Sequence, residues 1–305
     1  MSAHLSYVEA VVVGAFQGVT ELFPVSSLGH SVLVPALLGG QWARDLDVSA
    51  PKSPYLAFIV GLHVATAAAL LVFFWRDWVR IVAGFFSSVR YRRVQTAGER
   101  LAWLMVAGTI PVGLAGLALE KLFRTTLGRP IPAAVFLILN GIALYVGEVL
   151  RRRAAPAPGR ATASDGEPAH TDEAIDNRLA RMPIGRGVLI GSAQILALLP
   201  GISRSGIAMV AGLWRGLSHE DAARFSFLLA TPIILAAGVY KIPDLLGPLA
   251  AGIGGQVLAG SVASFVCAYL AVRYLTKYFQ TRTLTPFAIY CVLAGGAGLA
   301  WLTLR

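Results

Sequence analysis

The chain has 305 residues, 56% of them hydrophobic and only 14% charged, and its mean hydropathy is +0.67. Soluble domains carry about a quarter charged residues, so this composition excludes a soluble globular protein and indicates an integral membrane protein. The 26 Lys and Arg exceed the 16 Asp and Glu, which gives a net charge of +10. These basic residues fall in short loops between apolar runs, where they orient a membrane protein, so the sequence predicts no nucleic-acid partner.

Two apolar stretches, residues 7–38 and 184–215, are longer than the roughly 20 residues that cross a bilayer once. The first is interrupted midway by PVSSLGH, residues 24–30, and the second by PGISRSG, residues 200–206. Proline and glycine interrupt helices. Each stretch therefore predicts a re-entrant helical hairpin that enters and leaves on the same side of the membrane.

Six further windows hold the roughly 20 predominantly apolar residues expected of a spanning helix. They are residues 55–75, 102–122, 131–150, 222–240, 253–273 and 285–304. The predicted fold is an all-α polytopic membrane protein with six transmembrane helices and two re-entrant helical hairpins.

The distribution of Lys and Arg supports this topology, because cytoplasmic loops accumulate them. Six lie in residues 76–100, seven in residues 151–186 and three in residues 273–282. If both broken stretches are re-entrant, these three segments face the cytoplasm and the opposite loops keep only scattered basic residues. The first hairpin then enters from outside and the second from the cytoplasm.

The same topology predicts an inverted repeat, in which each half is a broken hairpin followed by three spans. The first repeat covers residues 1–150 and the second residues 184–305. Residues 151–183 are rich in Ala, Pro, Gly, Arg and acidic side chains without an apolar period, which predicts a disordered cytoplasmic linker. The motif at the first break recurs at the second with a one-residue offset: Gln17, Pro24, Ser26, Ser27 and Gly29 correspond to Gln194, Pro200, Ser203, Ser205 and Gly206.

Small residues recur every fourth position on one predicted span, at Gly260, Ser264 and Ala268. Such a pattern lets helices approach closely. The sequence leaves open whether this contact lies within the subunit or in a homodimer.

Polar side chains are concentrated at the first break, where hydrocarbon should not tolerate them. Gln17 and Glu21 are four residues apart and share one face of a helix, and with Ser26, Ser27 and His30 they lie within fourteen residues. Non-helical backbone at membrane depth survives only against protein or a water-filled cavity. We therefore expect this break to line a polar cavity.

The second break adds a cation to the predicted cavity. Ser203, Arg204, Ser205 and Gly206 immediately precede an apolar helical run, which places a guanidinium, two hydroxyls and free backbone N–H groups at a helix N-terminus. That combination is typical of an anion site, for phosphate in particular. A charge at the centre of a membrane helix costs roughly 2.5–3.5 kcal/mol, so Arg204 and Glu21 each need a compensating partner or ligand.

Each of these residues also has a purely structural interpretation. Ser203 or Ser205 alone is a common helix N-cap, and Arg204 could hold the two breaks together by pairing with Glu21 without any chemistry. His30 alone could be a core histidine with satisfied ring nitrogens. His63, inside the window 55–75, could face the cavity, but we interpret it as a packing residue.

The two motifs resemble those of the undecaprenyl-diphosphate phosphatases, a bacterial membrane family associated with bacitracin resistance. The resemblance covers nearly the whole chain and is most specific in QGVTELFPVSSLGH, residues 17–30, and LPGISRSG, residues 199–206, supported by FSFLLA, residues 225–230. It implies hydrolysis of the terminal phosphate of undecaprenyl diphosphate at the outer face of the bacterial plasma membrane. The product, undecaprenyl phosphate, is the carrier lipid for peptidoglycan synthesis.

The resemblance also implies residue roles, which agree with the chemistry of phosphoryl transfer. Arg204, Ser203, Ser205, Gly206 and Ser26 would bind the diphosphate. Ser27 or His30 would attack the terminal phosphorus, with Glu21 orienting the base or holding Mg²⁺ or Ca²⁺. The sequence does not decide between the two nucleophiles, and we favour Ser27 assisted by His30.

Two positions depart from the family pattern. Many members carry Glu where this chain has Gln17, and Thr where it has Ala208. The first change removes a negative charge and so weakens the predicted divalent-cation site of Glu21 and Gln17. The second removes a hydroxyl that could contact the diphosphate.

Two other functions remain open on the sequence. Inverted repeats with broken helices are also the architecture of alternating-access carriers, so the anion site could move a polyprenyl phosphate across the bilayer as a transporter or flippase. A structural membrane scaffold would leave the polar residues without any chemistry. Release of inorganic phosphate from undecaprenyl diphosphate distinguishes the phosphatase from both.

Overall fold

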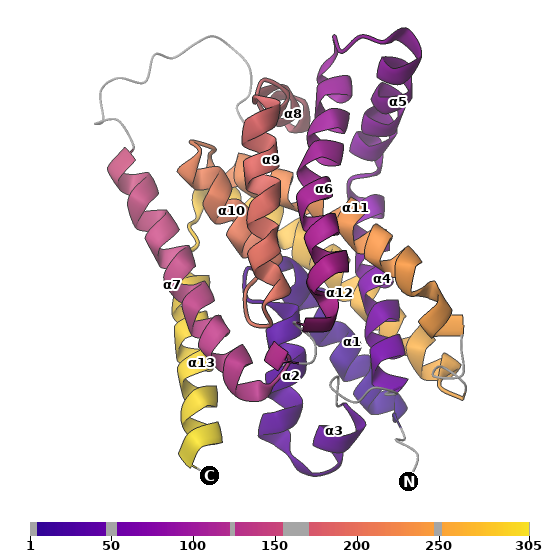
Figure 1. Cartoon of the computed structure of the whole chain (residues 1–305), viewed down its shortest axis with the longest axis vertical. Coiled ribbons are helices and arrows are strands. Elements are labelled where there is room, and N and C mark those ends of the chain that lie inside the picture. The colour runs from indigo at the N-terminus through magenta and orange to yellow at the C-terminus, as the bar shows by residue number, and fades with distance from the viewer. Residues whose placement is uncertain (1–4, 47–53, 123–125, 155–170, 247–251, 305) are drawn as a thin grey trace.

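A computed structural model describes residues 5–46, 54–122, 126–154, 171–246 and 252–304, and every regular element within these ranges is helical (Figure 1). The elements that begin the chain are α1 (Tyr7–Leu22), α2 (Ser27–Leu38), α3 (Gly40–Asp45), α4 (Pro54–Phe73), α5 (Trp75–Tyr91), α6 (Ala97–Leu122) and α7 (Pro130–Ala154). The remaining elements are α8 (Asp172–Ala180), α9 (Ile184–Ala193), the 3₁₀ helix η2 (Gln194–Leu198), α10 (Arg204–Trp214), α11 (His219–Leu246), α12 (Gly254–Thr281) and α13 (Thr285–Leu304).

Both predicted helix breaks are present. α1 ends at Leu22, immediately before the Pro24 turn, and α2 begins after the N-cap Ser26. In the second half, α9 tightens into η2, and α10 begins after the N-cap Ser203. Proline cannot donate the backbone hydrogen bond that continues a helix. Each break therefore lies at its predicted proline, Pro24 in the first half and Pro200 in the second.

Five helices in the described residues are long and apolar enough to span a membrane, or six if the bent pair α4 and α5 is one span. Four of the five, α6, α7, α11 and α12, extend beyond their predicted windows, and α13 matches its window of residues 285–304. The predicted division into six spans plus two re-entrant hairpins requires a membrane reference and stays a prediction.

The segment after α4 was expected to be a basic loop and is instead helix α5. The chain bends by 88° between Phe73 and Trp75 and continues to Tyr91. The buried residues Asp77, Ile81, Gly84 and Ser88 follow a helical spacing and lie on one face, which packs against α6. This amphipathic pattern explains how a strongly basic segment forms a helix.

The prediction of a disordered linker over residues 151–183 is wrong at both ends. α7 extends through Arg153 to Ala154, and α8 (Asp172–Ala180) buries Ile175 and Leu179. Ion pairs hold α8 in place: Asp176 lies 2.7 Å from the Arg80 guanidinium on α5 and 2.8 Å from Arg224 Nε on α11. Residues 155–170 lie outside the described ranges.

The helices cross in a pattern that repeats between the halves. α1 packs against α12, and α9 packs against α6. At the first crossing a Cβ on Gly14 would overlap the carbonyl of Gly260, and at the second a Cβ on Gly191 would overlap the carbonyl of Gly108. Gly191 lies 177 positions after Gly14, the same separation as Gln194 from Gln17 and Ser203 from Ser26. The two halves therefore have equivalent crossings, and the inverted repeat stays a prediction.

The small residues of α12 therefore pack within the subunit. A Cβ on Gly18 would overlap the backbone at Ser264, one turn along α12 from Gly260. Of the two packing modes left open by the sequence, the intramolecular one accounts for this pattern, and the predicted homodimer is untested.

The two interrupted hairpins lie in opposite halves of the molecule. In Figure 1, α1 and α2 lie in the lower half of the molecule, and α9 and α10 lie in the upper half. The turn between α5 and α6, the end of α7 and α8 all lie at the upper end. Residues 76–100, 151–154 and 171–186, the described parts of two of the three basic segments, are thus gathered at one end of the molecule.

Candidate functional site

The two helix breaks, which we call the first tip (residues 23–30) and the second tip (residues 199–206), contact each other directly. Ser26 Oγ accepts hydrogen bonds of 3.2 Å from the backbone N–H of Gly29 in its own tip and of Gly201 in the opposite tip. Ser26 has φ = 67°, an unusual conformation for a residue with a side chain. Such a conformation costs about 1–3 kcal/mol and clusters at functional sites.

Ser203, the N-cap residue of the second tip, also contacts the first tip. Ser203 Oγ accepts from Gly206 N–H at 3.2 Å and lies 3.4 Å from the Phe23 carbonyl, to which it donates. Ser205 Oγ donates to the same carbonyl at 3.3 Å. Both predicted hydroxyls therefore bind the backbone of the first tip. Ser203 is also the N-cap that the structural interpretation proposed.

A buried asparagine that the sequence interpretation missed connects the two tips. Asn140, 1% exposed on α7, donates from Nδ2 to the Pro24 carbonyl at 3.0 Å and accepts from Ser203 N–H at 2.9 Å. One amide thus uses its donor on the first tip and its acceptor on the second. A single Asn in the middle of an apolar window was the available signal, because such a polar group needs internal partners.

The predicted contact between the Arg204 guanidinium and the Glu21 carboxylate is confirmed. Arg204 Nη2 lies 2.6 Å from Glu21 Oε1, and Arg204 Nη1 donates to the Ala230 carbonyl at 3.1 Å. Both charged side chains are largely buried, with 7% of the Glu21 and 15% of the Arg204 side chain exposed. Charge-assisted hydrogen bonds of this kind are stronger than neutral ones.

The second oxygen of the Glu21 carboxylate faces the predicted nucleophile. Ser27 Oγ donates to Glu21 Oε2, and Gln17 Nε2 donates to the same oxygen at 3.0 Å. All three side chains are buried. Glu21 is thus in position to accept the proton of the Ser27 hydroxyl.

His30 does not assist Ser27 in the way that the sequence analysis favoured. Its Nδ1 lies 2.8 Å from the Ser26 carbonyl, and its Nε2 lies 2.8 Å from the Tyr290 hydroxyl of α13. A carbonyl can only accept, so Nδ1 carries the proton and, in the neutral ring, Nε2 accepts from Tyr290. Both ring nitrogens therefore bind groups other than the Ser27 hydroxyl. Tyr290 could not be identified as a site residue from the sequence, because tyrosines are common near the ends of membrane helices.

His63 lies in the site, so its interpretation as a packing residue is wrong. Its Nε2 lies 3.2 Å from Gln17 Nε2 and 3.4 Å from Glu21 Oε2, and 30% of its side chain is exposed. The window 55–75 was read as an ordinary span, but His63 on α4 faces α1 at the turn that carries Gln17.

The side chains of the site do not fit a resident Mg²⁺ or Ca²⁺. These cations bind several oxygen ligands, mainly carboxylates and carbonyls. Glu21 supplies the one carboxylate here, and both its oxygens already bind Arg204, Ser27 and Gln17. Among the described residues no group of three or more His, Cys, Asp or Glu side chains could hold a metal ion. Gln17 Oε1, which is buried and without a partner, is the one spare acceptor in this set.

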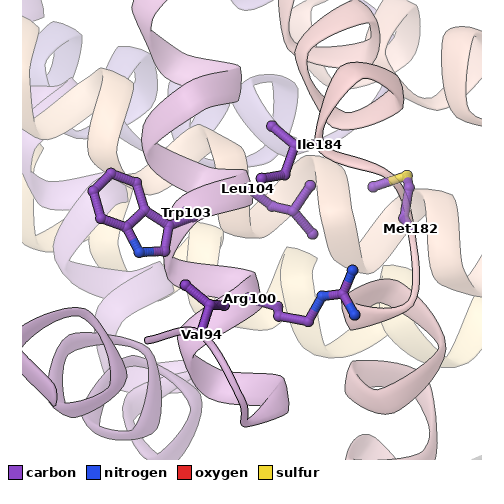
Figure 2. Close-up of a pocket in the computed structure, with 6 residues that line it drawn as sticks. All are labelled: Val94, Arg100, Trp103, Leu104, Met182 and Ile184. Carbon is purple, nitrogen blue, oxygen red and sulfur yellow. The ribbon is translucent and has the colours of Figure 1, made fainter. Parts of the chain in front are cut away.

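A separate pocket of about 300 Å³ lies beside the start of α6 (Figure 2). It shares no residue with the two tips. Its lining residues are Val94, Arg100, Trp103, Leu104, Met182 and Ile184.

The geometry of the tips can therefore bind an anion and activate a hydroxyl. Arg204 supplies a buried cation at the N-terminus of α10, where the helix dipole also favours negative charge. Beside it, Ser27 is paired with a carboxylate base. This is the geometry of nucleophilic catalysis, in which a weak nucleophile is activated by an adjacent base.

The sequence matches the family described as bacitracin resistance protein BacA over residues 10–297, which is most of the chain. The chain belongs to the BacA family. It is 82% identical to the undecaprenyl-diphosphatase of Mycolicibacterium paratuberculosis and 81% identical to that of Mycobacterium avium, in each case over all of both chains. A more distant relative, undecaprenyl-diphosphatase 2 of Chromobacterium violaceum, is 41% identical over 97% of this chain and 98% of its own length.

Proposed function

We propose that this chain is an undecaprenyl-diphosphatase, which hydrolyses undecaprenyl diphosphate to undecaprenyl phosphate and inorganic phosphate. The observation that carries the proposal is the Glu21 carboxylate, which binds the Arg204 guanidinium at 2.6 Å with one oxygen and the Ser27 hydroxyl with the other. The names of relatives with 81% and 82% identity over the full length support the same activity. The reaction would recycle the carrier lipid for cell-wall synthesis.

In this proposal the second tip binds the diphosphate. Arg204 and the N-terminus of α10 would hold the phosphate oxygens, with Ser203, Ser205 and Gly206 around them. Ser26 would contribute by holding the first tip against the second through its bond from Gly201 N–H at 3.2 Å. The polyprenyl chain would lie along the apolar surfaces of neighbouring helices and needs no polar motif.

The chemical step would begin at Ser27. Its hydroxyl oxygen attacks the terminal phosphorus while Glu21 takes the proton, and the bond from that phosphorus to the bridging oxygen breaks. Undecaprenyl phosphate leaves, and water then hydrolyses the phosphoserine to release inorganic phosphate. His30, bonded to the Ser26 carbonyl and to Tyr290, would fix the turn that presents Ser27.

We further propose that the site opens toward the outer face of the bacterial plasma membrane. The clustering of residues 76–100, 151–154 and 171–186 at one end of the molecule supports this orientation, because basic segments stay in the cytoplasm. The first tip approaches from the opposite end. The substrate headgroup would therefore enter from outside.

The test is release of inorganic phosphate from undecaprenyl or farnesyl diphosphate by the purified protein in detergent. Ser27→Ala should reduce kcat by at least about 1000-fold, as expected for loss of a nucleophile. Arg204→Ala should reduce it by about 100- to 1000-fold, as for loss of a group that stabilises the developing charge. Ser192→Ala and the exposed Arg186→Ala are matched controls outside the tips and should retain the wild-type rate.

Trapping the covalent intermediate distinguishes the two nucleophiles. Rapid quench with labelled substrate should place the phosphoryl group on Ser27, and label on His30 would reverse the assignment. Tight binding of the diphosphate without any phosphate release would instead indicate the transporter. Full activity of Ser27→Ala and Arg204→Ala would contradict the proposed site.

A further inference from the structure

His63 is a polar residue of the site to which the proposed reaction assigns no role. It lies on α4, and its ring is oriented by an Nδ1 contact of 2.8 Å to the Ile59 carbonyl, one turn earlier in the same helix. Because a carbonyl only accepts, Nδ1 is the protonated nitrogen of the neutral ring. Its Nε2 therefore presents a lone pair toward α1.

The partner of that lone pair is the amide of Gln17. Gln17 Nε2 lies 3.2 Å from His63 Nε2 and 3.0 Å from Glu21 Oε2. An amide nitrogen carries two hydrogens, so one is donated to His63 and the other to Glu21. With the His63 ring neutral, this arrangement fixes which end of the Gln17 amide faces the carboxylate, since the amide oxygen would repel both the Nε2 lone pair and Glu21 Oε2, which lie 3.4 Å apart.

The turn of α4 that carries His63 is itself fastened to α12. Ser264 Oγ donates to the Leu62 carbonyl at 3.2 Å and lies 3.1 Å from Thr66 Oγ1. These contacts lie on both sides of His63 along the helix. Since α12 also packs closely on α1 at Gly14 and Gly18, the three helices fix His63 relative to Gln17.

We propose that His63 is a positioning residue for the reaction. By accepting from the Gln17 amide, it makes Gln17 donate to Glu21 Oε2 and so holds that oxygen on the Ser27 hydroxyl. His63 thus acts through Gln17 and need not touch the substrate. The inference rests on the proposed function, because it concerns the base that activates Ser27.

The test compares kcat and KM for farnesyl diphosphate in His63→Ala, His63→Gln and the wild type. His63→Ala should reduce kcat by about 10- to 100-fold, as expected when catalytic groups are displaced by about 1 Å. KM should change by less than about threefold, because His63 does not belong to the anion-binding second tip. His63→Gln should recover most of the rate, since its carbonyl oxygen can accept from the Gln17 amide.

Ser88→Ala is the control, because it removes the buried hydrogen bond of 3.0 Å that Trp103 Nε1 on α6 donates to Ser88 Oγ on α5, outside the two tips and their contacts. It should lower the melting temperature and keep the wild-type kcat. A merely structural role for His63 would make His63→Ala resemble this control, with a lower melting temperature and an unchanged rate, and would overturn the inference.

A double-mutant cycle adds a second criterion. If His63 acts through Gln17, the Gln17→Ala/His63→Ala double variant should be no slower than Gln17→Ala alone, whereas independent effects would multiply. Multiplying effects overturn the inference. Failure of the proposed function looks different, because Ser27→Ala and Arg204→Ala would then remain active.

Discussion

The Arg204 guanidinium and the Glu21 carboxylate lie 2.6 Å apart although 183 positions separate them in the chain. Each belongs to a different interrupted helix hairpin, and each would be costly in hydrocarbon alone. Together with the Ser26 and Asn140 contacts, this ion pair joins the two tips into one polar site.

The pair should matter more for activity than for stability. Arg204→Met or Glu21→Leu alone leaves an uncompensated buried charge, so each should destabilise the fold by about 3–5 kcal/mol. The Glu21→Leu/Arg204→Met double variant should regain most of this loss, because apolar replacement of a buried pair is often neutral. Phosphate release should stay absent in the double variant. Thermal unfolding in detergent and the phosphate assay measure the two properties, and an active double variant would support the purely structural interpretation.

Asn140 should be required to hold the tips together. Asn140→Leu leaves the Pro24 carbonyl and the Ser203 N–H without partners, at a cost of about 1–3 kcal/mol for each group. The resulting shift of the tips should lower kcat by about 10- to 100-fold. Asn177→Ala on α8 is the control at a position outside the tips. An Asn140→Leu variant with normal melting temperature and rate would show that the bridge is dispensable.

The sequence predicted the parts of this site whose chemistry conflicts with a membrane. Glu21 and Arg204 stand out because a charge in an apolar run is costly, and the serines around them lie at obvious helix breaks. His63 and Asn140 were missed or misread because each is a single polar residue in a long apolar window. Their partners lie 46 positions away for His63 to Gln17 and 116 for Asn140 to Pro24.

The errors in the fold have a similar cause. α5 was expected to be a loop because its basic residues dominate the composition, although its buried face has a helical period. α8 was assigned to a disordered linker because its few apolar residues form no run. Its order depends on ion pairs with Arg80 and Arg224, which are distant in sequence. Composition alone could not reveal these contacts.

The two matched helix crossings should respond in the same way to a methyl group. Gly14→Ala and Gly191→Ala each place a Cβ against a backbone carbonyl, which cannot move as a flexible side chain can. Each should cost about 1–3 kcal/mol, as for other overpacked sites. Gly113→Ala on α6 meets open space and should leave the melting temperature unchanged or slightly higher. Unequal effects at Gly14 and Gly191 would argue against equivalent crossings.

Gln17 should determine how strongly activity depends on a divalent cation. With Gln17 neutral, the site supplies one carboxylate, which is already bound by Arg204 and Ser27. Gln17→Glu adds a second carboxylate beside it, and carboxylates are preferred ligands of Mg²⁺ and Ca²⁺. Activity titrated with a chelator and then with either cation should show a steeper requirement in Gln17→Glu than in the wild type. Equal dependence in both would show that residue 17 is not a determinant of cation use.

The re-entrant topology can be tested by labelling single cysteines in a cysteine-free background. If the hairpins are re-entrant, both ends of each one lie on the same face of the membrane. In intact cells a membrane-impermeant maleimide should label Tyr7→Cys and Leu38→Cys, whereas Gly185→Cys and Arg215→Cys should react only after permeabilisation. Arg92→Cys, in the basic turn after α5, is the control for the inner face. Labelling of one end of a hairpin from outside and of its other end from inside would instead make that hairpin a full crossing, and the two halves would no longer be inverted.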